Sequence, residues 1–122
     1  VVDDDETVRG TAKRILERAG YNVLTASGGR EAINIFRRYS TEITLVLLDL
    51  TMSDMNSEEV FTEIKRLRKD SRVILSSGYT EQEALDQFIQ VGLAGFIQKP
   101  YKSAALIQLI KETIGSDTQK IT

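Results

Sequence analysis

Short apolar runs alternate with longer segments of helical periodicity along the whole chain. The runs cover residues 1–2, 23–26, 45–48, 73–75 and 95–97, and they are typical of buried strands. Between them, apolar residues recur three and four positions apart, as on one face of a helix. The five stripes are Val8, Ala12, Ile15, Leu16 and Ala19; Ala32, Ile33, Phe36 and Tyr39; Val60, Phe61, Ile64 and Leu67; Ala84, Leu85, Phe88 and Ile89; and Leu106, Ile107, Ile110 and Ile114. We interpret them as the core-facing sides of five helices.

Five strands that alternate with five helices predict an α/β fold with a parallel sheet. Crossover connections between parallel strands are right-handed and place helices on both faces of the sheet. In such doubly wound sheets, ligands bind beyond the carboxyl ends of the strands, where the strand order reverses. Functional residues are therefore expected directly after the apolar runs.

Local signals mark several helix ends. Gly20 follows the first stripe and is typical of the residue that ends a helix. Asn56 and Glu59 have the spacing of an N-cap and its partner three residues later. Asp5 and Glu6 are typical of acids in the first turn of a helix.

The composition is that of a single globular domain. The chain has 122 residues, of which 41% are hydrophobic and 28% charged, and this length allows one substantial core. A formal net charge of -2 gives no general attraction to nucleic acid or anionic membranes. No apolar run approaches the roughly 20 residues that span a bilayer. We expect a cytoplasmic location.

Two missing residue types narrow the possible chemistry. The chain has no cysteine, which excludes thiolate catalysis, disulfides and cysteine-ligated zinc. It also has no histidine, which excludes serine–histidine triads and histidine general bases. Any chemistry must therefore use carboxylates, hydroxyls, lysines and backbone groups.

The ends of the chain suggest a domain cut from a longer polypeptide. The sequence opens with VVDDD and no methionine, and two valines are short for a strand. We expect residues 1–122 to form one excised domain, with residues 116–122 as a frayed tail.

Polar residues follow four of the apolar runs directly. Asp3 and Asp4 follow the first run, Asp49 the third, Ser76 and Ser77 the fourth, and Lys99 the fifth. Carboxyl ends of parallel strands meet at one edge, so these side chains are expected in one crevice. Two like charges about 4 Å apart repel by roughly 4 kcal/mol at an effective dielectric near 20, so three carboxylates there need cations. Lys99 supplies one, and Mg²⁺ is the divalent ion that fits carboxylates, waters and phosphate oxygens best.

Each of these residues also has a structural alternative. An aspartate at a strand end commonly caps the next helix, and Ser76 and Ser77 could do the same. A Lys–Pro pair is common in itself. Their joint placement at the ends of four strands favours a shared functional site.

Four motifs carry a resemblance to a known family. The segments VVDDDE, LVLLDLTM, VILSSGY and GLAGFIQKPY resemble, in order and spacing, the receiver domain of two-component response regulators. The resemblance covers essentially the whole chain. It implies a flavodoxin-like, doubly wound fold whose five parallel strands have the order 2-1-3-4-5.

The resemblance implies a role for each residue at the strand ends. Asp49 accepts the phosphoryl group. Asp3 and Asp4 hold Mg²⁺, Asp4 directly and Asp3 through water, and Asp49 and the backbone carbonyl of Thr51 are further ligands. Lys99 pairs with Asp49 and later with the phosphoryl group.

The resemblance also implies a conformational switch. Ser77 hydrogen-bonds a phosphoryl oxygen, and Phe96 moves inward after it, which remodels the surface of the fourth helix, fifth strand and fifth helix. The alternative for Phe96 is an outward aromatic on an edge strand. Thr51 and Tyr79 occupy positions that tune dephosphorylation, and the Lys99–Pro100 bond is expected to be cis.

The implied partners are phosphohistidine donors. A histidine kinase or a phosphotransfer domain supplies the phosphoryl group, and the domain catalyses its own phosphorylation and dephosphorylation without being a conventional enzyme. SSGYTEQEA and GLAGFIQKPY are most similar to receivers fused to hybrid sensor histidine kinases. We expect no nucleic-acid binding and no membrane insertion by this domain.

The loop after Asp49 departs from the family pattern. Receivers usually carry Met-Pro and then an Asp/Asn-Gly turn, where this chain has Ser53 and the pair Asn56–Ser57. Asparagine tolerates left-handed backbone, so Asn56 is expected to preserve the turn.

Three other functions were weighed against this one. A flavodoxin-type FMN binder needs a phosphate-binding loop after the first strand, where this chain is acidic. A haloacid-dehalogenase-type phosphatase needs a second carboxylate two residues after the nucleophile, where this chain has Thr51. The stronger alternative is a receiver-like module that docks partners without phosphorylation.

Overall fold

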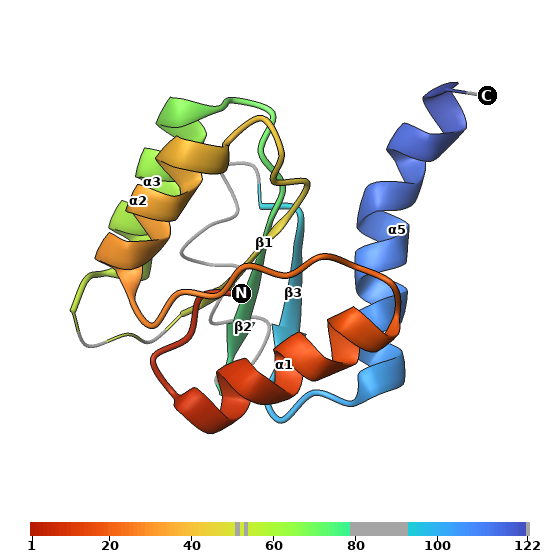
Figure 1. Cartoon of the computed structure of the whole chain (residues 1–122), viewed down its shortest axis with the longest axis horizontal. Helices are drawn as coiled ribbons and strands as arrows, with labels where there is room; N and C mark the ends of the chain where they lie inside the picture. Colours follow the sequence, from red (N-terminus) through yellow and green to blue (C-terminus); the bar gives the residue numbers. More distant parts are fainter. Residues whose placement is uncertain (51, 53, 79–92, 122) are drawn as a thin grey trace.

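Three parallel strands form the sheet of the described fold. The computed structural model describes residues 1–50, 52, 54–78 and 93–121, with side chains described as far as residue 114. The strands β1 (Val46–Asp49), β2 (Val73–Ser77) and β3 (Gly95–Gln98) pair in the order β1-β2-β3. The described helices are α1 (Glu6–Arg18), α2 (Gly29–Tyr39), α3 (Ser57–Leu67) and α5 (Ser103–Ile121). In Figure 1, α2 and α3 cover one face of the sheet and α1 and α5 the other.

Alternation along the strands divides the core into two clusters. Val46 and Leu48 of β1 and Val73 of β2 pack with α2 and α3, whereas Leu47 and Ile74 pack with α1 and α5. All five side chains are buried, and each contributes about 1.5–3 kcal/mol relative to an exposed position. The nearly continuous apolar runs thus reflect a sheet covered on both faces.

The first two predicted strands are single bridges in the structure. Val2 pairs in parallel with Ala26 on one side and Leu48 on the other, and neither 1–2 nor 23–26 forms a strand. A strand needs several consecutive paired residues, whereas only Val2 of this segment pairs with each of the two neighbouring segments. The described sheet therefore has three strands, and the predicted five strands and their order 2-1-3-4-5 stay a prediction.

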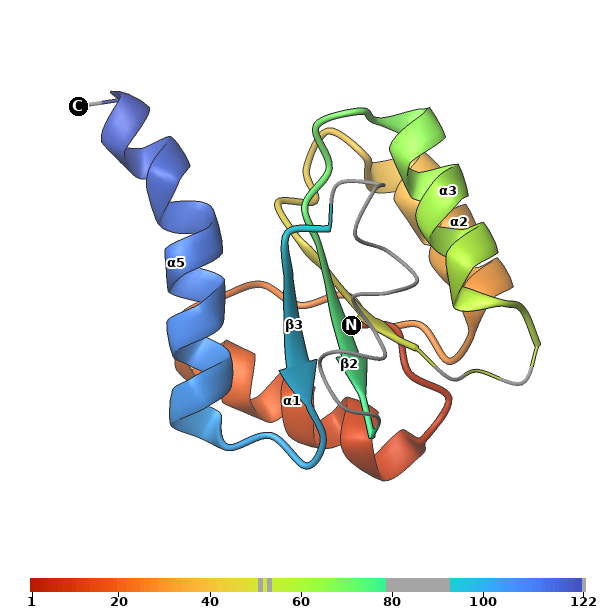
Figure 2. The same cartoon turned by 180° about the vertical axis from the view of Figure 1, so that it is seen from behind.

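The later helices agree with the sequence pattern only where the structure describes them. The stripe from Ala84 to Ile89 lies outside the described residues, as do Thr51 and Tyr79. The helix α5 continues to Ile121, through most of the segment that the sequence predicts to fray, and its end extends past the sheet in Figure 2. Within the described residues, no helix is sufficiently long and apolar to span a bilayer.

Helix ends follow the local signals closely. Asp5 is the N-cap of α1 and accepts hydrogen bonds from the backbone N–H of Thr7 at 2.9 Å and of Val8 at 3.2 Å. Gly20, with φ 98°, follows the C-cap, which confirms the predicted end of this helix.

Asn56 confirms one prediction and contradicts another. It is the N-cap of α3 and accepts from the N–H of Glu58 at 2.7 Å. Its φ of −64° and ψ of 132° are extended, so the left-handed turn expected here is wrong. An N-cap residue takes β-region dihedrals because its side chain must turn back to the first helical N–H groups.

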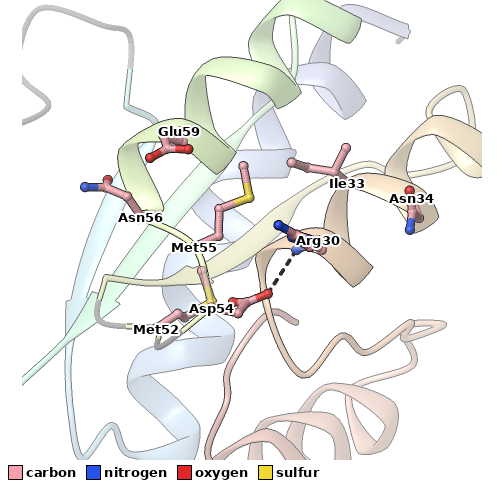
Figure 3. A pocket seen from close by; sticks show the side chains of 8 residues that line it. All are labelled: Arg30, Ile33, Asn34, Met52, Asp54, Met55, Asn56 and Glu59. Carbon is pink, nitrogen blue, oxygen red and sulfur yellow. Dashed lines mark hydrogen bonds between the residues drawn. The ribbon is translucent and has the colours of Figure 1, made fainter.

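The start of α2 is capped from another part of the chain. Its N-cap, Gly28, has no side chain to offer, and the carboxylate of Asp54 accepts from the N–H of Gly29 at 3.0 Å and from that of Arg30 at 3.3 Å. Figure 3 shows the second of these bonds. Arg30 and Asp54 border a pocket of about 620 Å³ beside α2 and the start of α3. The loop that follows β1 is thereby joined to α2.

Candidate functional site

Asp49 is the last residue of β1 and is almost completely buried. Its side chain is 2% exposed, and the preceding strand residues are all apolar and buried. Its N–H donates to the carbonyl of Val2 at 2.9 Å, and the N–H of Leu50 donates to the carbonyl of Ser76 at 2.8 Å. The two neighbouring segments therefore fix the backbone that carries this carboxylate.

Lys99 connects Asp49 with Asp3. Its ammonium nitrogen lies 2.9 Å from Asp49 Oδ1 and 2.8 Å from Asp3 Oδ2. The backbone N–H of Lys99 donates to the carbonyl of Ser77 at 2.7 Å, which fixes the lysine at the end of β3. The Lys99–Pro100 bond is cis, as predicted.

Asp3 is held as firmly as Asp49. It is 2% exposed, and its Oδ1 accepts from the N–H of Asp5 at 2.9 Å. Arg9, on α1, donates to the Asp3 carbonyl at 2.8 Å. The bridge between Val2 and Leu48 brings this segment beside β1, so residues about fifty positions apart in sequence meet at Lys99.

The electrostatics of the site favour a charged ammonium. Burial alone lowers the pKa of Lys99, but hydrogen bonds and charges from Asp3 and Asp49 outweigh it and raise that pKa above its ordinary value. Burial, followed by the negative charge of Asp3, raises the pKa of Tyr101 to about 12. The phenol of Tyr101 is therefore neutral at physiological pH.

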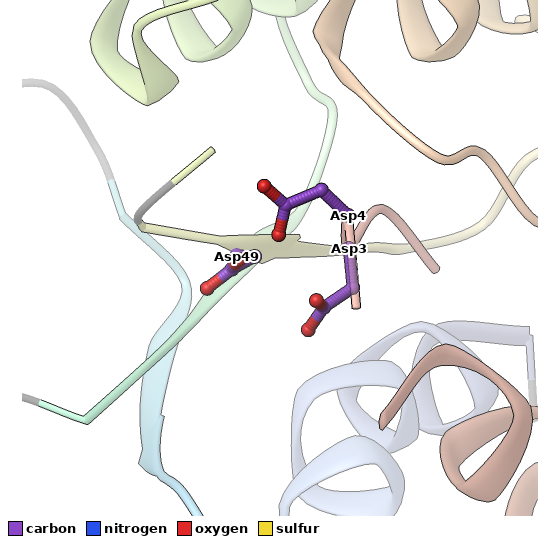
Figure 4. A group of neighbouring side chains, drawn as sticks. All are labelled: Asp3, Asp4 and Asp49. Atoms are coloured by element: carbon purple, nitrogen blue, oxygen red, sulfur yellow. The ribbon is translucent and has the colours of Figure 1, made fainter. Parts of the chain in front are cut away.

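Three carboxylates gather at the end of β1. Asp3, Asp4 and Asp49 each offer an oxygen, and these oxygens lie within 4.8 Å of one another (Figure 4). Lys99 balances only one of the three charges. The donor set consists of hard oxygen atoms, and Asp4 is exposed, so the residues fit a Mg²⁺ ion that enters from solvent.

Ser77 and Phe96 occupy the neighbouring strands. Ser77 ends β2 and is fully buried, and Asp49 pairs with Ser76 in the register of β1 and β2. Phe96, on β3, pairs with Leu75 of β2. Its half-buried side chain packs against the cluster that faces α2 and α3. The side chain of Phe96 therefore contacts the core, and its role as a switch stays a prediction.

Two residues near the site were not found from the sequence. Ser57 is 4% exposed, and its hydroxyl lies 2.6 Å from the carbonyl oxygen of Asp49 and 2.5 Å from that of Leu50. Asp54 lies in the same loop and caps α2. The sequence signal that could have indicated them is the replacement of the family's usual proline and glycine in this loop, because a serine side chain can form hydrogen bonds there.

Comparisons with known proteins agree on one family. The model of the response regulator receiver domain matches residues 1–111. The chain is 30% identical over 115 residues to the chemotaxis protein CheY of Bacillus subtilis, with 93% of this chain and 94% of CheY covered. It is 29% identical over 114 residues to the sensor kinase CckA of Brucella abortus, with 93% of this chain and 12% of CckA covered.

A solved structure supports the same conclusion. A chain in the CheX–CheY–BeF3–Mg²⁺ complex of Borrelia burgdorferi has a TM-score of 0.86 and 28% identity, with 91% of this chain and 84% of that chain covered. The present chain belongs to the response regulator receiver domain family of two-component signalling. The family predicted from the four sequence motifs is confirmed.

Proposed function

We propose that Asp49 accepts a phosphoryl group from a phosphohistidine on a histidine kinase or a phosphotransfer domain. The observation that carries this proposal is the position of the Lys99 ammonium, 2.8 Å from Asp3 and 2.9 Å from Asp49, beside the exposed Asp4. A buried nucleophilic carboxylate with a fixed cation and an open acidic neighbour suits phosphoryl transfer.

The reaction forms one bond and breaks another. An Asp49 carboxylate oxygen bonds to phosphorus while the phosphorus–nitrogen bond of the phosphohistidine breaks, and the imidazole leaves. Lys99 neutralises charge on the transferring group, and the Ser77 hydroxyl donates to one of its oxygens. Mg²⁺, when bound by Asp4, Asp49, the Thr51 carbonyl and, through water, Asp3, supplies further neutralisation of charge.

Phosphorylation then changes a surface of the domain. In our proposal, the bond from Ser77 to the phosphoryl group draws Ser77 inward and vacates space for Phe96. The responding surface is formed by the fourth helix, β3 and α5. Thr51 and Tyr79 tune the rate of dephosphorylation.

The wider context is also a proposal. The chain matches nearly all of CheY but 12% of CckA, so a single-domain regulator and a hybrid kinase are both represented among its relatives. We favour a receiver in the cytoplasmic part of a hybrid sensor histidine kinase, with residues 1–122 containing the receiver domain. The sheet extends, in this proposal, to the family order 2-1-3-4-5.

Phosphate uptake measured by intact mass tests the function. With acetyl phosphate and Mg²⁺, we expect one phosphoryl group on the wild-type protein and none on Asp49→Ala or in EDTA. Asp70→Asn is the control, because Asp70 is an exposed aspartate paired with Arg68, far from β1 in sequence, and it should leave uptake intact. Undiminished uptake by Asp49→Ala, or by wild type in EDTA, contradicts the proposal, and no uptake by wild type favours a phosphorylation-independent docking module.

A further inference from the structure

The side chains of Ser57 and Asp54 hold the loop after Asp49. This chain has Ser53 and Ser57 where receivers usually carry proline and glycine. The structure describes Leu50, Met52 and residues 54–57 of this loop. The inference below concerns how the loop keeps Asp49 in place, and it rests on the proposed function of Asp49.

Ser57 holds the chain immediately after Asp49. Its single hydroxyl proton is shared between the carbonyl oxygens of Asp49, at 2.6 Å, and Leu50, at 2.5 Å. Ser57 is the first residue of α3 and is 4% exposed, so water cannot easily replace this donor. A buried carbonyl that loses its partner costs about 1–3 kcal/mol, so the contact strongly constrains both peptide groups.

The backbone of Asp49 and Leu50 is thereby fixed on all sides. The N–H groups of these two residues donate to the carbonyls of Val2 and Ser76, which belong to the segments on either side of β1. Ser57 completes the set by binding the two carbonyl groups. If Ser57 lost its hydroxyl, the Leu50 carbonyl would lose this donor and could reorient, and the adjoining backbone of Asp49 could shift with it.

Asp54 holds the middle of the same loop. Its carboxylate accepts from the N–H groups of Gly29 and Arg30, at 3.0 and 3.3 Å, and these bonds, that from Gly29 first, lower the pKa of Asp54. The helix end it binds has no side-chain cap of its own. A Cβ at Gly28 would lie 2.7 Å from the Asp54 carboxylate oxygens, so a side chain there would displace the carboxylate from this cap.

We propose that Ser57 and Asp54 are positioning residues for phosphoryl transfer to Asp49. Ser57 fixes the two peptide groups that follow the acceptor, and Asp54 ties their loop to the start of α2. In-line attack requires the carboxylate oxygen to be aligned with the donor, and a displacement of about 1 Å can reduce a rate by about 100-fold. Ser57 stands where the family usually has glycine, which has no hydroxyl for this contact.

Kinetics of phosphorylation by acetyl phosphate, at saturating Mg²⁺, test this proposal. For Ser57→Ala we expect the maximal rate to fall about tenfold while the half-saturating donor concentration stays unchanged, because Asp49 is misaligned but the donor contacts remain. Ser57→Thr keeps the hydroxyl and should recover most of the rate. Asp54→Ala should lower the maximal rate about threefold. Asp54→Asn keeps an oxygen acceptor and should recover the wild-type rate.

Ser71→Ala is the matched control. Ser71 is 6% exposed, and its hydroxyl donates to the carbonyl of Arg68 at 2.6 Å, as Ser57 does to that of Asp49, but it precedes β2 at the opposite edge of the sheet. Its loss should lower stability about as much as Ser57→Ala and leave the rate unchanged. A second readout is the Mg²⁺ titration of amide chemical shifts, in which the Leu50 amide should be displaced in Ser57→Ala before any ion is added.

The possible outcomes separate the two proposals. If wild type takes up no phosphate on Asp49, the proposed function fails. If wild type is phosphorylated and both Ser57→Ala and Asp54→Ala keep the wild-type maximal rate, or Ser71→Ala slows as much as they do, the positioning role is wrong. Asp54 is exposed, so its variants remain informative even if Ser57→Ala does not fold.

Discussion

Among the described residues, the Lys99 ammonium forms ion pairs with both Asp3 and Asp49. Both carboxylates are 2% exposed, whereas the lysine side chain is 20% exposed. The lysine side chain therefore reaches from the surface to two buried carboxylates. Its ammonium forms an ion pair with each of them, which stabilises both negative charges.

Lys99→Met should destabilise the unphosphorylated domain. Breaking a fully buried ion pair costs about 3–5 kcal/mol, and we expect about 1–2 kcal/mol here because Lys99 is partly exposed. Urea unfolding in EDTA measures the loss, and adding Asp49→Asn should restore most of it because one uncompensated charge disappears. Lys102→Met, at an exposed position, is the control and should change stability by less than about 0.5 kcal/mol. Equal effects of the two lysine variants contradict this role for Lys99.

At the scale of elements, two helical glycines differ in how much space surrounds them. Gly10 lies inside α1, and a Cβ added to it would meet only the end of the Arg14 side chain, at 3.5 Å. Gly29 begins α2, and a Cβ there would lie 2.6 Å from Val60 Cγ2 and 2.8 Å from Met55 Cβ. The first glycine weakens its helix, and the second allows α2 to approach α3.

Alanine at these two positions should therefore shift stability in opposite directions. Gly10→Ala should stabilise the domain by about 0.5–1 kcal/mol, because alanine loses less backbone entropy in a helix. Gly29→Ala should destabilise it by about 1–3 kcal/mol, because neither neighbour can move without repacking the core. Each value comes from the urea midpoint at unchanged m-value. A neutral Gly29→Ala would show that the contact between α2 and α3 yields easily.

At the scale of the whole molecule, the proposed signal crosses the sheet from β2 to β3. Ser77 is fully buried at the end of β2, and Phe96 on the adjacent strand packs with the cluster beneath α2 and α3. Register pairing between these strands joins Leu75 to Phe96 and Ser77 to Gln98. A movement of Ser77 would therefore displace the paired residues of β3.

Amide chemical shifts with and without beryllofluoride test this coupling. In wild type we expect shifts along β3 and the first half of α5 as well as beside Asp49. In Ser77→Ala the shifts beside Asp49 should persist, while those of β3 and α5 should fall to less than about half, because the donor to the phosphoryl mimic is lost. Ser71→Ala should respond as wild type does. If β3 shifts equally in wild type and Ser77→Ala, Ser77 does not transmit the signal.

The sequence by itself determined the elements and the chemistry of the site. Stripes and runs located α1, α2, α3, α5 and the three strands, because burial imposes their periodicities on the chain. Asp5 and Gly20 marked helix ends through local hydrogen bonds and backbone conformation, which depend on near neighbours only. Polar residues directly after apolar runs predicted a shared crevice, because parallel strands end at one edge.

Tertiary structure alone decided which of these residues meet and what holds them. Val2 forms single bridges where a strand was expected, because pairing depends on how many residues the neighbouring segments align. Asn56 is extended because its cap bond to Glu58, rather than its tolerance of left-handed backbone, sets its conformation. The contacts of Ser57 with Asp49 and of Asp54 with Gly29 join positions 8 and 25 residues apart, and such contacts leave no periodic signal in the chain.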